Sequence, residues 1–489
     1  MKRRNFLAGT MAGAAAVATS AESVAAPETQ GRKPNILWIC TDQQRWDTIH
    51  ALGNEHVHTP NIDRLVAEGV SFTHAYCQSP ICTPSRASFL TGMYPGTLHA
   101  CMNGNDSWDN AAPLITKTLA DIGYDCGLSG KFHLSAADGR IEPRVDDGYR
   151  VFQWSHHPGD DWPEGHDYKD WLVSKGIDYN TTHKKYGYIP AEHHQTTWCA
   201  EVAIDFIRER RTAPWLFSLN CFDPHPALDP PQEYVDRYDV ESAPGPYYQD
   251  SDLAAQKKLS GIRFQSEAKH PDEFDAKKRQ VLYWAQIDLI DEQVGRILDV
   301  LEETGQRDNT VIIFTSDHGN SVGDHGLINK GCRFYEGLTR VPLIFSWPGY
   351  FKQNLQSDAL VELTDIVPML LELAGLPIPD DMHGKSLLPI LTGVANAGEH
   401  REFVRSTYYR ALDDKLQSYA TMIRNRRYKL VHFHGHGLGE LFDLENDPHE
   451  FTNLFDSPDH KNIRLSMTDQ SFDAMAFAID VGSKRVGRY

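Results

Sequence analysis

Residues 35–44 have the sequence NILWICTDQQ, an apolar run of strand length that ends in polar side chains. The same pattern returns at 124–129, 215–220 and 310–315. Amphipathic helical patterns over 114–122, 196–210 and 281–301 precede these three runs, and Gly123 and Gly305 predict the ends of two of them. This alternation predicts an α/β fold in which a mixed, mostly parallel sheet is sandwiched by helices on both faces.

Polar and charged residues follow each of the four predicted strands. In open parallel sheets, ligands bind outside the carboxyl ends of the strands. Each residue alone has an ordinary explanation as a turn, capping or solvated side chain. Their joint placement at one end of the sheet instead predicts a metal site beside a cationic pocket. The metal site comprises Asp42, Gln43, Asp317 and His318, and the pocket comprises Arg86, Lys131, His133 and His225.

The predicted ligands indicate the metal and the kind of substrate. Two carboxylates and an amide oxygen are hard ligands that suit Ca²⁺ or Mg²⁺. The imidazole of His318 is less typical of Ca²⁺ and leaves Mn²⁺ or Zn²⁺ possible. A hard cation beside basic residues suits an anionic, oxygen-rich centre such as a sulfate or phosphate ester.

Residues 82–92, CTPSRASFLTG, predict a helix with a reactive group at its start. Pro84 suits the first helical position, and Gly92 suits the position just past the end. Cys82 would then lie at a helix N-terminus, where an anion is favoured, and Arg86 would lie one turn further in. Taken alone, the motif is equally that of a buried cysteine beside a capped helix.

The length, net charge and cysteine spacing of the chain limit its possible domains, partners and cross-links. The 489 residues predict a large domain and a smaller one. The net charge of −19 argues against a nucleic-acid partner or an anionic membrane surface. The eight cysteines form no C-x-x-C pair, which argues against a disulfide framework or a structural zinc site.

Residues 1–25 have the pattern of an export signal. The paired Arg3-Arg4 precedes a short apolar run and a small-residue cleavage site, which predicts a twin-arginine signal peptide. The run is too short for a membrane anchor. We therefore expect a protein that is periplasmic or secreted, with no membrane partner.

At these motifs the sequence resembles a known family. Residues 82–92 match the type I sulfatase signature C-x-P-S-R-x-x-x-L-T-G in full. The resemblance also covers the segments around 42, 131, 225 and 317, Gly323-Asp324-His325-Gly326 with Lys330, and residues 383–387 and 441–448. It implies an alkaline-phosphatase-like catalytic domain, assigned to residues 32–395. A smaller C-terminal α+β domain of antiparallel strands and a helix is assigned to residues 396–489.

The resemblance further implies that a separate maturation enzyme oxidises Cys82 to formylglycine (3-oxoalanine). One hydroxyl of the hydrated aldehyde attacks sulfur, and the second then loses its proton and expels sulfate. Asp42, Gln43, Asp317, His318 and the modified Cys82 would hold one divalent cation, Ca²⁺ or else Mg²⁺ or Mn²⁺. The implied roles are support of the modified residue for Arg86, sulfate binding for Lys131, proton acceptance for His133, and proton donation to the leaving oxygen for His225 and Lys330.

Two positions depart from the commonest family pattern, because Gln43 stands where Asp is frequent and His318 where Asn is frequent. Both resemble the choline-sulfatase and phosphonate-monoester-hydrolase branches. The sequence therefore predicts a sulfatase acting on a sulfated carbohydrate or polysaccharide. A phosphonate monoester or phosphodiester hydrolase is the alternative within the enzymes. A catalytically inactive paralogue that binds sulfated glycans is a third possibility, although every catalytic position is occupied.

Two connections, 140–190 and 226–271, are expected to be structureless, functional loops. Their aromatic residues suit stacking on sugar rings, but plain packing against the domain explains them equally well. Near the end of the chain, 418–433 predicts strands and 466–481 predicts a closing helix.

Overall fold

The computed structural model describes residues 33–108, 112–137, 140–159, 165–412 and 415–479. The predicted export signal at 1–25 lies outside these residues. Within the described ranges, no helix is both long enough and apolar enough to cross a membrane.

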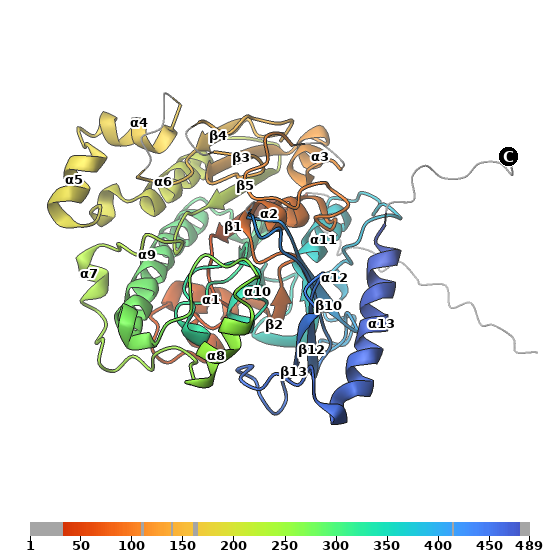
Figure 1. Ribbon diagram of the computed structural model, residues 1–489. Helices are drawn as coiled ribbons and strands as arrows, with labels where there is room; N and C mark the ends of the chain where they lie inside the picture. Colours follow the sequence, from red (N-terminus) through yellow and green to blue (C-terminus); the bar gives the residue numbers. More distant parts are fainter. Residues whose placement is uncertain (1–32, 109–111, 138–139, 160–164, 413–414, 480–489) are drawn as a thin grey trace, which may run out of the picture.

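The larger sheet has nine strands in the order β4-β3-β5-β1-β6-β8-β2-β7, and β9 also pairs with β2. Figure 1 labels β4, β3, β5 and β1 of this sheet from the top downward. The four predicted strands are neighbours in a parallel block, β3-β5-β1-β6, which confirms the predicted fold class. The far side adds antiparallel pairs of β8 with β6 and of β2 with β7 and β8. The strands are β1 Asn35–Thr41, β2 Gly69–Tyr76, β3 Asp125–Gly130, β4 Val151–Trp154, β5 Trp215–Asn220, β6 Thr310–Ser316, β7 Arg340–Val341, β8 Leu343–Ser346 and β9 Leu355–Glu362.

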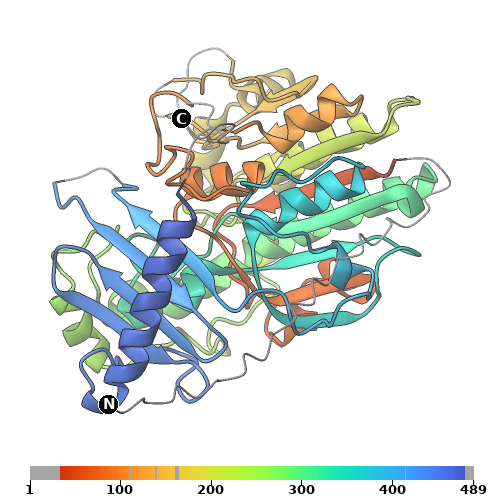
Figure 2. The same cartoon turned by 90° about the vertical axis from the view of Figure 1, so that its right-hand side faces the viewer.

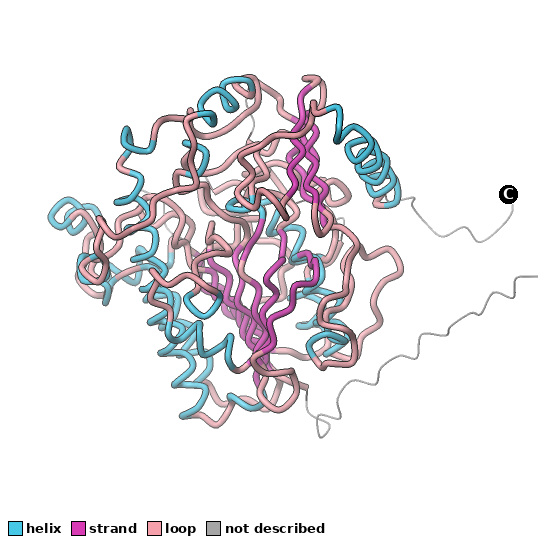
Figure 3. The backbone as a smooth tube through the Cα atoms, turned by 90° about the horizontal axis from the view of Figure 1, so that it is seen from below, coloured by secondary structure: helices cyan, strands magenta, loops and turns pink. Residues whose placement is uncertain are grey.

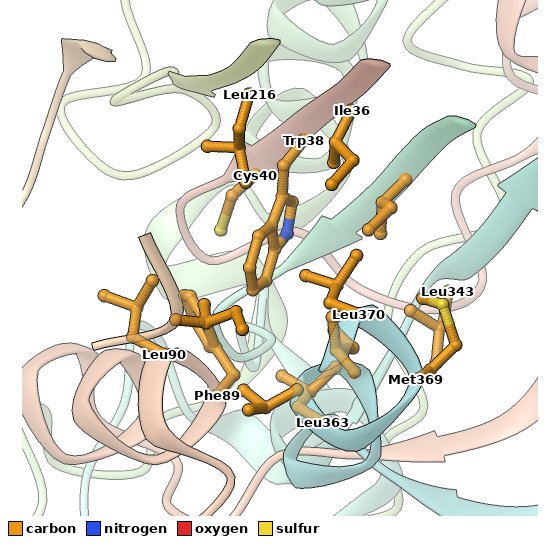
Figure 4. Close-up of a cluster of buried hydrophobic side chains, with 14 of the residues drawn as sticks. Ile36, Trp38, Cys40, Phe89, Leu90, Leu216, Leu343, Leu363, Met369 and Leu370 are labelled. Carbon is orange, nitrogen blue, oxygen red and sulfur yellow. The ribbon is translucent and has the colours of Figure 1, made fainter. Parts of the chain in front are cut away.

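Helices cover both faces of this sheet because its central strands are apolar on both sides. Trp38 and its alternate neighbours pack with Phe89 and Leu370 (Figure 4), whereas Leu37 and Ile39 pack in a separate cluster on the other face. The helices are α1 Pro60–Ala67, α2 Cys82–Thr91, α3 Ile115–Asp121, α4 Asp167–Ser174, α5 Tyr179–Tyr186, α6 Gln195–Arg208, α7 Gln232–Val235, α8 Ser251–Lys258, α9 Ala276–Glu303, α10 Glu336–Thr339, α11 Ile366–Leu373, α12 Leu388–Leu391 and α13 Lys461–Phe477. Helices α2, α3 and α11 supply the first cluster, and α1, α6 and α9 supply the second.

A second, four-stranded antiparallel sheet follows, with the order β10-β11-β12-β13. Its strands are β10 Val404–Tyr409, β11 Tyr419–Arg424, β12 Tyr428–Phe433 and β13 Leu438–Asp443. Helix α13 crosses one face of this sheet (Figure 2), where Met467 packs on Ile423 and Leu441. Figure 3 shows the strands of the two sheets as separate groups. The predicted boundary at 395/396 stays a prediction, and the closing helix begins at Lys461 rather than near 466.

The two long connections are not structureless, so that expectation was wrong. Residues 140–190 contain β4, α4 and α5, and residues 226–271 contain α7 and α8. Tyr168 of α4 and Tyr234 of α7 are buried, which bears out the packing explanation for these two aromatic residues. Short polar helices of this kind have too few apolar positions to produce a strong periodic signal.

Candidate functional site

The four parallel strands bring their predicted polar residues to one edge of the sheet. The register pairs Thr41 at the end of β1 with Ser316 of β6, and Asn220 of β5 with both Cys40 and Gly130. Asp42, Lys131 and Asp317 therefore follow β1, β3 and β6 at the carboxyl edge of this four-strand block. The structure thus places these groups together as the sequence predicts.

Helix α2 places Cys82 against this edge. Cys82 is the first residue of the helix, Ile81 is the N-cap, and Gly92 ends the helix with a φ of 74°. Pro84 is therefore the third helical residue rather than the first. Proline is tolerated there because the N–H groups of the first turn have no partner within the helix.

Four buried residues group their potential ligand atoms around Cys82. Atoms of Asp42, Cys82, Asp317 and His318 lie within 4.8 Å of one another. The Cys82 Sγ is 3.2 Å from His318 Nε2 and 3.6 Å from Asp42 Oδ1. Two carboxylates, an imidazole and the group at position 82 can therefore surround one small cation.

Gln43, the remaining predicted ligand, directly follows Asp42. Its backbone N–H donates to Asp317 Oδ1 at 3.0 Å, and its carbonyl accepts the Tyr283 hydroxyl at 2.6 Å. Its left-handed backbone, with a φ of 71°, is thus held on both sides. Neither atom of its buried side-chain amide has a hydrogen-bond partner among the described residues. A buried amide without a partner is costly, and a cation bound by its oxygen would satisfy that oxygen.

Three basic side chains balance the carboxylates. Lys131 Nζ forms an ion pair with Asp42, and Lys330 Nζ lies 2.8 Å from Cys82 Sγ. Arg86 Nε donates to Asp317 Oδ2 at 2.9 Å, and its Nη1 donates to the Lys131 carbonyl at 3.0 Å. All three cations are buried, so their charges act on this site with little screening by water.

These charges set the protonation states. Burial opposes ionisation of Asp42, but Lys131 holds the pKa of that carboxyl well below its usual range. Burial opposes the charge of Lys131 as well, but Asp42 raises the pKa of the ammonium. Burial, reinforced by Asp42, raises the pKa of the Cys82 thiol. The unmodified thiol is therefore a poor nucleophile.

His133 follows β3 in a left-handed conformation with a φ of 60°. Its ring lies edge-on to the ring of His156, with centroids 4.6 Å apart. Burial and the charge of Lys131 lower the pKa of His133 well below its usual value. Its imidazole is therefore neutral in the free enzyme.

His225 lies half-buried after β5, with its ring 4.5 Å from the ring of Phe222. Its Nδ1 lies 2.6 Å from the Pro226 carbonyl, which can only accept, so this nitrogen carries the proton. Burial and Lys330 lower the pKa of His225 well below its usual value. Lys131 Nζ also lies over the Phe222 ring, 5.3 Å from the ring centroid.

Sequence reasoning missed two residues that hold the site. Asn103 Oδ1 accepts the Thr83 N–H at 3.1 Å in the first turn of α2. Glu142 accepts the backbone N–H of His133 at 2.7 Å. Both residues lie in irregular segments, where a single side chain that binds backbone groups leaves no periodic pattern in the sequence.

Comparison with known proteins gives the family. The family model described as Sulfatase matches residues 34–376, and the one described as N-sulphoglucosamine sulphohydrolase, C-terminal, matches residues 323–475. An arylsulfatase from Clostridium perfringens is 32% identical over 457 residues, which cover 88% of this chain and 92% of the relative. An N-acetylglucosamine-6-O-sulfatase from Bacteroides thetaiotaomicron is 26% identical over 508 residues, which cover 90% of this chain and 86% of the relative.

Among solved structures, the phosphonate monoester hydrolase of Agrobacterium radiobacter superposes with a TM-score of 0.78 and 26% identity, covering 91% of this chain and 96% of that one. The resemblance inferred from the motifs is thus confirmed over nearly the whole described chain. The protein belongs to the sulfatase family, whose members hydrolyse sulfate esters.

Proposed function

We propose that this protein hydrolyses sulfate monoesters of a carbohydrate, using a formylglycine made from Cys82 by a maturation enzyme and one divalent cation. The observation that supports this most strongly is the position of Cys82. Its Sγ lies within 4 Å of two predicted ligand residues, Asp42 and His318, and of two lysines, Lys131 and Lys330. The raised pKa of its thiol also fits a precursor better than a thiolate nucleophile.

The residues present fit the proposed cation. Asp42, Asp317, His318, the modified Cys82 and the buried amide of Gln43 would hold it. Their mainly hard oxygen donors favour Ca²⁺, with Mg²⁺ or Mn²⁺ as alternatives. When bound, the cation would supply a positive charge that activates the nucleophile and offsets charge developing on the ester.

The basic residues would bind the sulfate group and transfer protons. Lys131 and Arg86 present fixed positive charge to the sulfate oxygens, which stabilises a transition state that gains negative charge. Neutral His133 would accept the proton of the second hydroxyl as sulfate is expelled. Lys330 and His225 would protonate the leaving alcohol. The lowered pKa of His225 leaves its imidazole neutral in the free enzyme, whereas Lys330 Nζ lies 2.8 Å from Cys82 Sγ.

The carbohydrate part of the proposal is supported by the N-acetylglucosamine-6-O-sulfatase relative. A cavity of about 270 Å³, lined in part by Phe222, also offers polar groups to a hydroxyl-rich ring. Within it, His183 pairs with Asp229 at 2.8 Å. We also propose export to the periplasm or beyond by the twin-arginine route, on the basis of residues 1–25.

The test is a release assay with protein whose conversion at position 82 has been verified by mass. We expect inorganic sulfate to be released from sulfated oligosaccharides and from an aryl sulfate. Turnover should depend on an added divalent cation. No sulfate release from any ester by fully converted protein would contradict the proposal.

A phosphonate monoester or phosphodiester hydrolase remains the second candidate. Gln43 and His318 in the ligand set favour it, as does the match to the phosphonate monoester hydrolase structure. The same preparation assayed on an aryl phosphonate monoester decides between the two. A kcat/KM for the phosphonate above that for the sulfate esters would establish the second function. Binding of sulfated sugar without any turnover would instead indicate an inactive paralogue.

A further inference from the structure

One buried carboxylate anchors the loop that carries His133. Glu142 is 4% exposed, and its Oε1 accepts the N–H groups of Leu134 at 2.5 Å and Ser135 at 2.9 Å. Its Oε2 accepts the N–H of His133 at 2.7 Å and Nε1 of Trp154 at 3.1 Å. Three consecutive backbone N–H groups and an indole thus converge on one side chain.

This arrangement carries two energetic costs. A carboxylate in the interior is unfavourable unless it is well hydrogen-bonded. The left-handed conformation of His133 is also unfavourable for a residue with a Cβ. Without Glu142, the three N–H groups would lose a buried acceptor, and the hydrogen bonds that hold the left-handed backbone at His133 would be lost.

The direction of the His133 ring follows from this backbone conformation. Lys131 and His133 leave the end of β3 two residues apart, and the ring of His133 lies against His156. Its Nδ1 is buried and has no hydrogen-bond partner among the described residues. Packing against His156 and the backbone conformation, rather than a hydrogen bond at Nδ1, therefore orient the ring.

We infer that Glu142 is a positioning residue for the proton acceptor of the proposed reaction. It fixes the backbone of residues 133–135 so that the His133 ring is held at the catalytic edge. The inference rests on the proposed function. Glu142 acts through His133, because none of its described hydrogen bonds reaches Cys82.

Asp147 provides a matched control. It is also buried in the segment between β3 and β4, and its Oδ1 accepts a backbone N–H, that of Tyr149, at 2.7 Å. It forms an ion pair with Arg144 at 2.8 Å. None of its described hydrogen bonds reaches the backbone of residues 133–135. Loss of its carboxylate tests what a purely structural change in this segment does.

The experiment is a double-mutant cycle on converted, cation-loaded protein, with Glu142→Gln, His133→Ala and the pair. Glu142→Gln should lower kcat by about 10- to 100-fold with little change in KM, because a small displacement of a catalytic group costs up to that much. In the His133→Ala background the same substitution should have almost no further effect on kcat. Asp147→Asn should leave kcat close to wild type and, in that background, should act independently.

Independent, multiplicative effects of Glu142→Gln and His133→Ala would overturn the inference while the proposed function stands. A wild-type protein that releases no sulfate would overturn the proposed function itself. Thermal unfolding of each variant establishes that it is folded at the assay temperature. If Glu142→Gln does not fold, Glu142→Asp is used in the same cycle, since it keeps the charge and shortens the reach to the loop.

Discussion

The ammonium of Lys330 lies 2.8 Å from Cys82 Sγ and 3.2 Å from His318 Nε2, in the buried centre of the site. This places a proton donor beside the residue that is proposed to attack the ester. We expect Lys330→Ala to lower kcat by about 10²- to 10⁴-fold on sugar sulfates, whose alcohols leave poorly without a proton. On an aryl sulfate with an acidic phenol, the loss should be much smaller. Kinetics on both substrates measures the difference.

His225→Ala is the matched comparison for Lys330→Ala. If Lys330 is the donor in the free enzyme, the ratio of sugar-sulfate to aryl-sulfate activity should fall more in Lys330→Ala than in His225→Ala. The reverse order would assign proton donation to His225. Equal losses on both substrates in Lys330→Ala would show that this lysine serves binding instead.

Removal of the cation should destabilise the folded protein as well as stop turnover. Asp42 and Asp317 are both fully buried, and a bound cation offsets their mutual repulsion. A ligand that binds only the folded state raises its stability by an amount that grows with ligand concentration. Chelation should therefore lower Tm, and added Ca²⁺ should restore it. An unchanged Tm across chelation and Ca²⁺ addition would contradict the assigned ligands.

Cys82→Ser should separate the two steps of the proposed chemistry. A serine at position 82 has one hydroxyl, so it can accept the sulfo group but has no second hydroxyl to expel it. We expect this variant to be sulfated once at residue 82 and then to stop, as detected by intact-protein mass. Cys82→Ala should show neither sulfation nor turnover. Steady turnover by the serine variant would rule out the two-hydroxyl mechanism.

The pair of His325 and Asp252 predicts a pH dependence of stability away from the metal ligands. His325 is buried, with Nδ1 3.2 Å from Asp252 Oδ1 and its ring stacked on Tyr335. Burial opposes its charge, but Asp252 raises the pKa of His325, and Asp324 and Glu450 act in the same direction. A histidine whose pKa is higher in the folded state stabilises that state fully below about pH 6.5.

This stabilisation is lost as the pH rises through the folded-state pKa. Between pH 5 and pH 9, the Tm of the wild-type protein should therefore include a fall as the pH rises. This fall should be smaller in Asp252→Asn. If wild type and Asp252→Asn gave parallel curves, the charged pair would not contribute to stability.

Lys429 of the second sheet links that sheet to α10. Its Nζ is buried at 2.7 Å from both Glu336 Oε1 and Glu450 Oε1. Removing one member of a buried ionic network leaves the other charges unpaired, so Lys429→Met should lower the free energy of unfolding by about 3–5 kcal/mol. Arg426→Ala breaks an exposed pair with Asp358 and should cost at most about 1 kcal/mol. Denaturant unfolding compares them, and similar small losses would show that the buried network does not hold the sheets together.

The parallel core of the fold was predictable because its strands are continuous apolar runs. The predicted limits of β5 are those observed, and β1, β3 and β6 differ by about one residue. The sheet was predicted to be mixed, but the positions of its antiparallel strands were not. Its β2 contains Ser71, Thr73 and His74, so the segment lacks a continuous apolar run, and β7 has only two residues.

The candidate site was predictable where residues directly follow strands, as Asp42 and Asp317 do. Glu142 shows why the rest was not. It lies nine residues after His133, and its contribution is to accept backbone N–H groups, which every non-proline residue possesses. Only the folded path of the loop shows which N–H groups converge on this carboxylate.

Sulfate release by converted protein tests the central claim most directly. The measurement compares inorganic sulfate released from a sulfated oligosaccharide by wild type and by Cys82→Ala, with conversion at position 82 quantified by mass in each wild-type preparation. The account predicts that the rate rises in proportion to the converted fraction and is absent in Cys82→Ala. Sulfate release that does not depend on conversion, or its absence in fully converted and Ca²⁺-loaded protein, would contradict it.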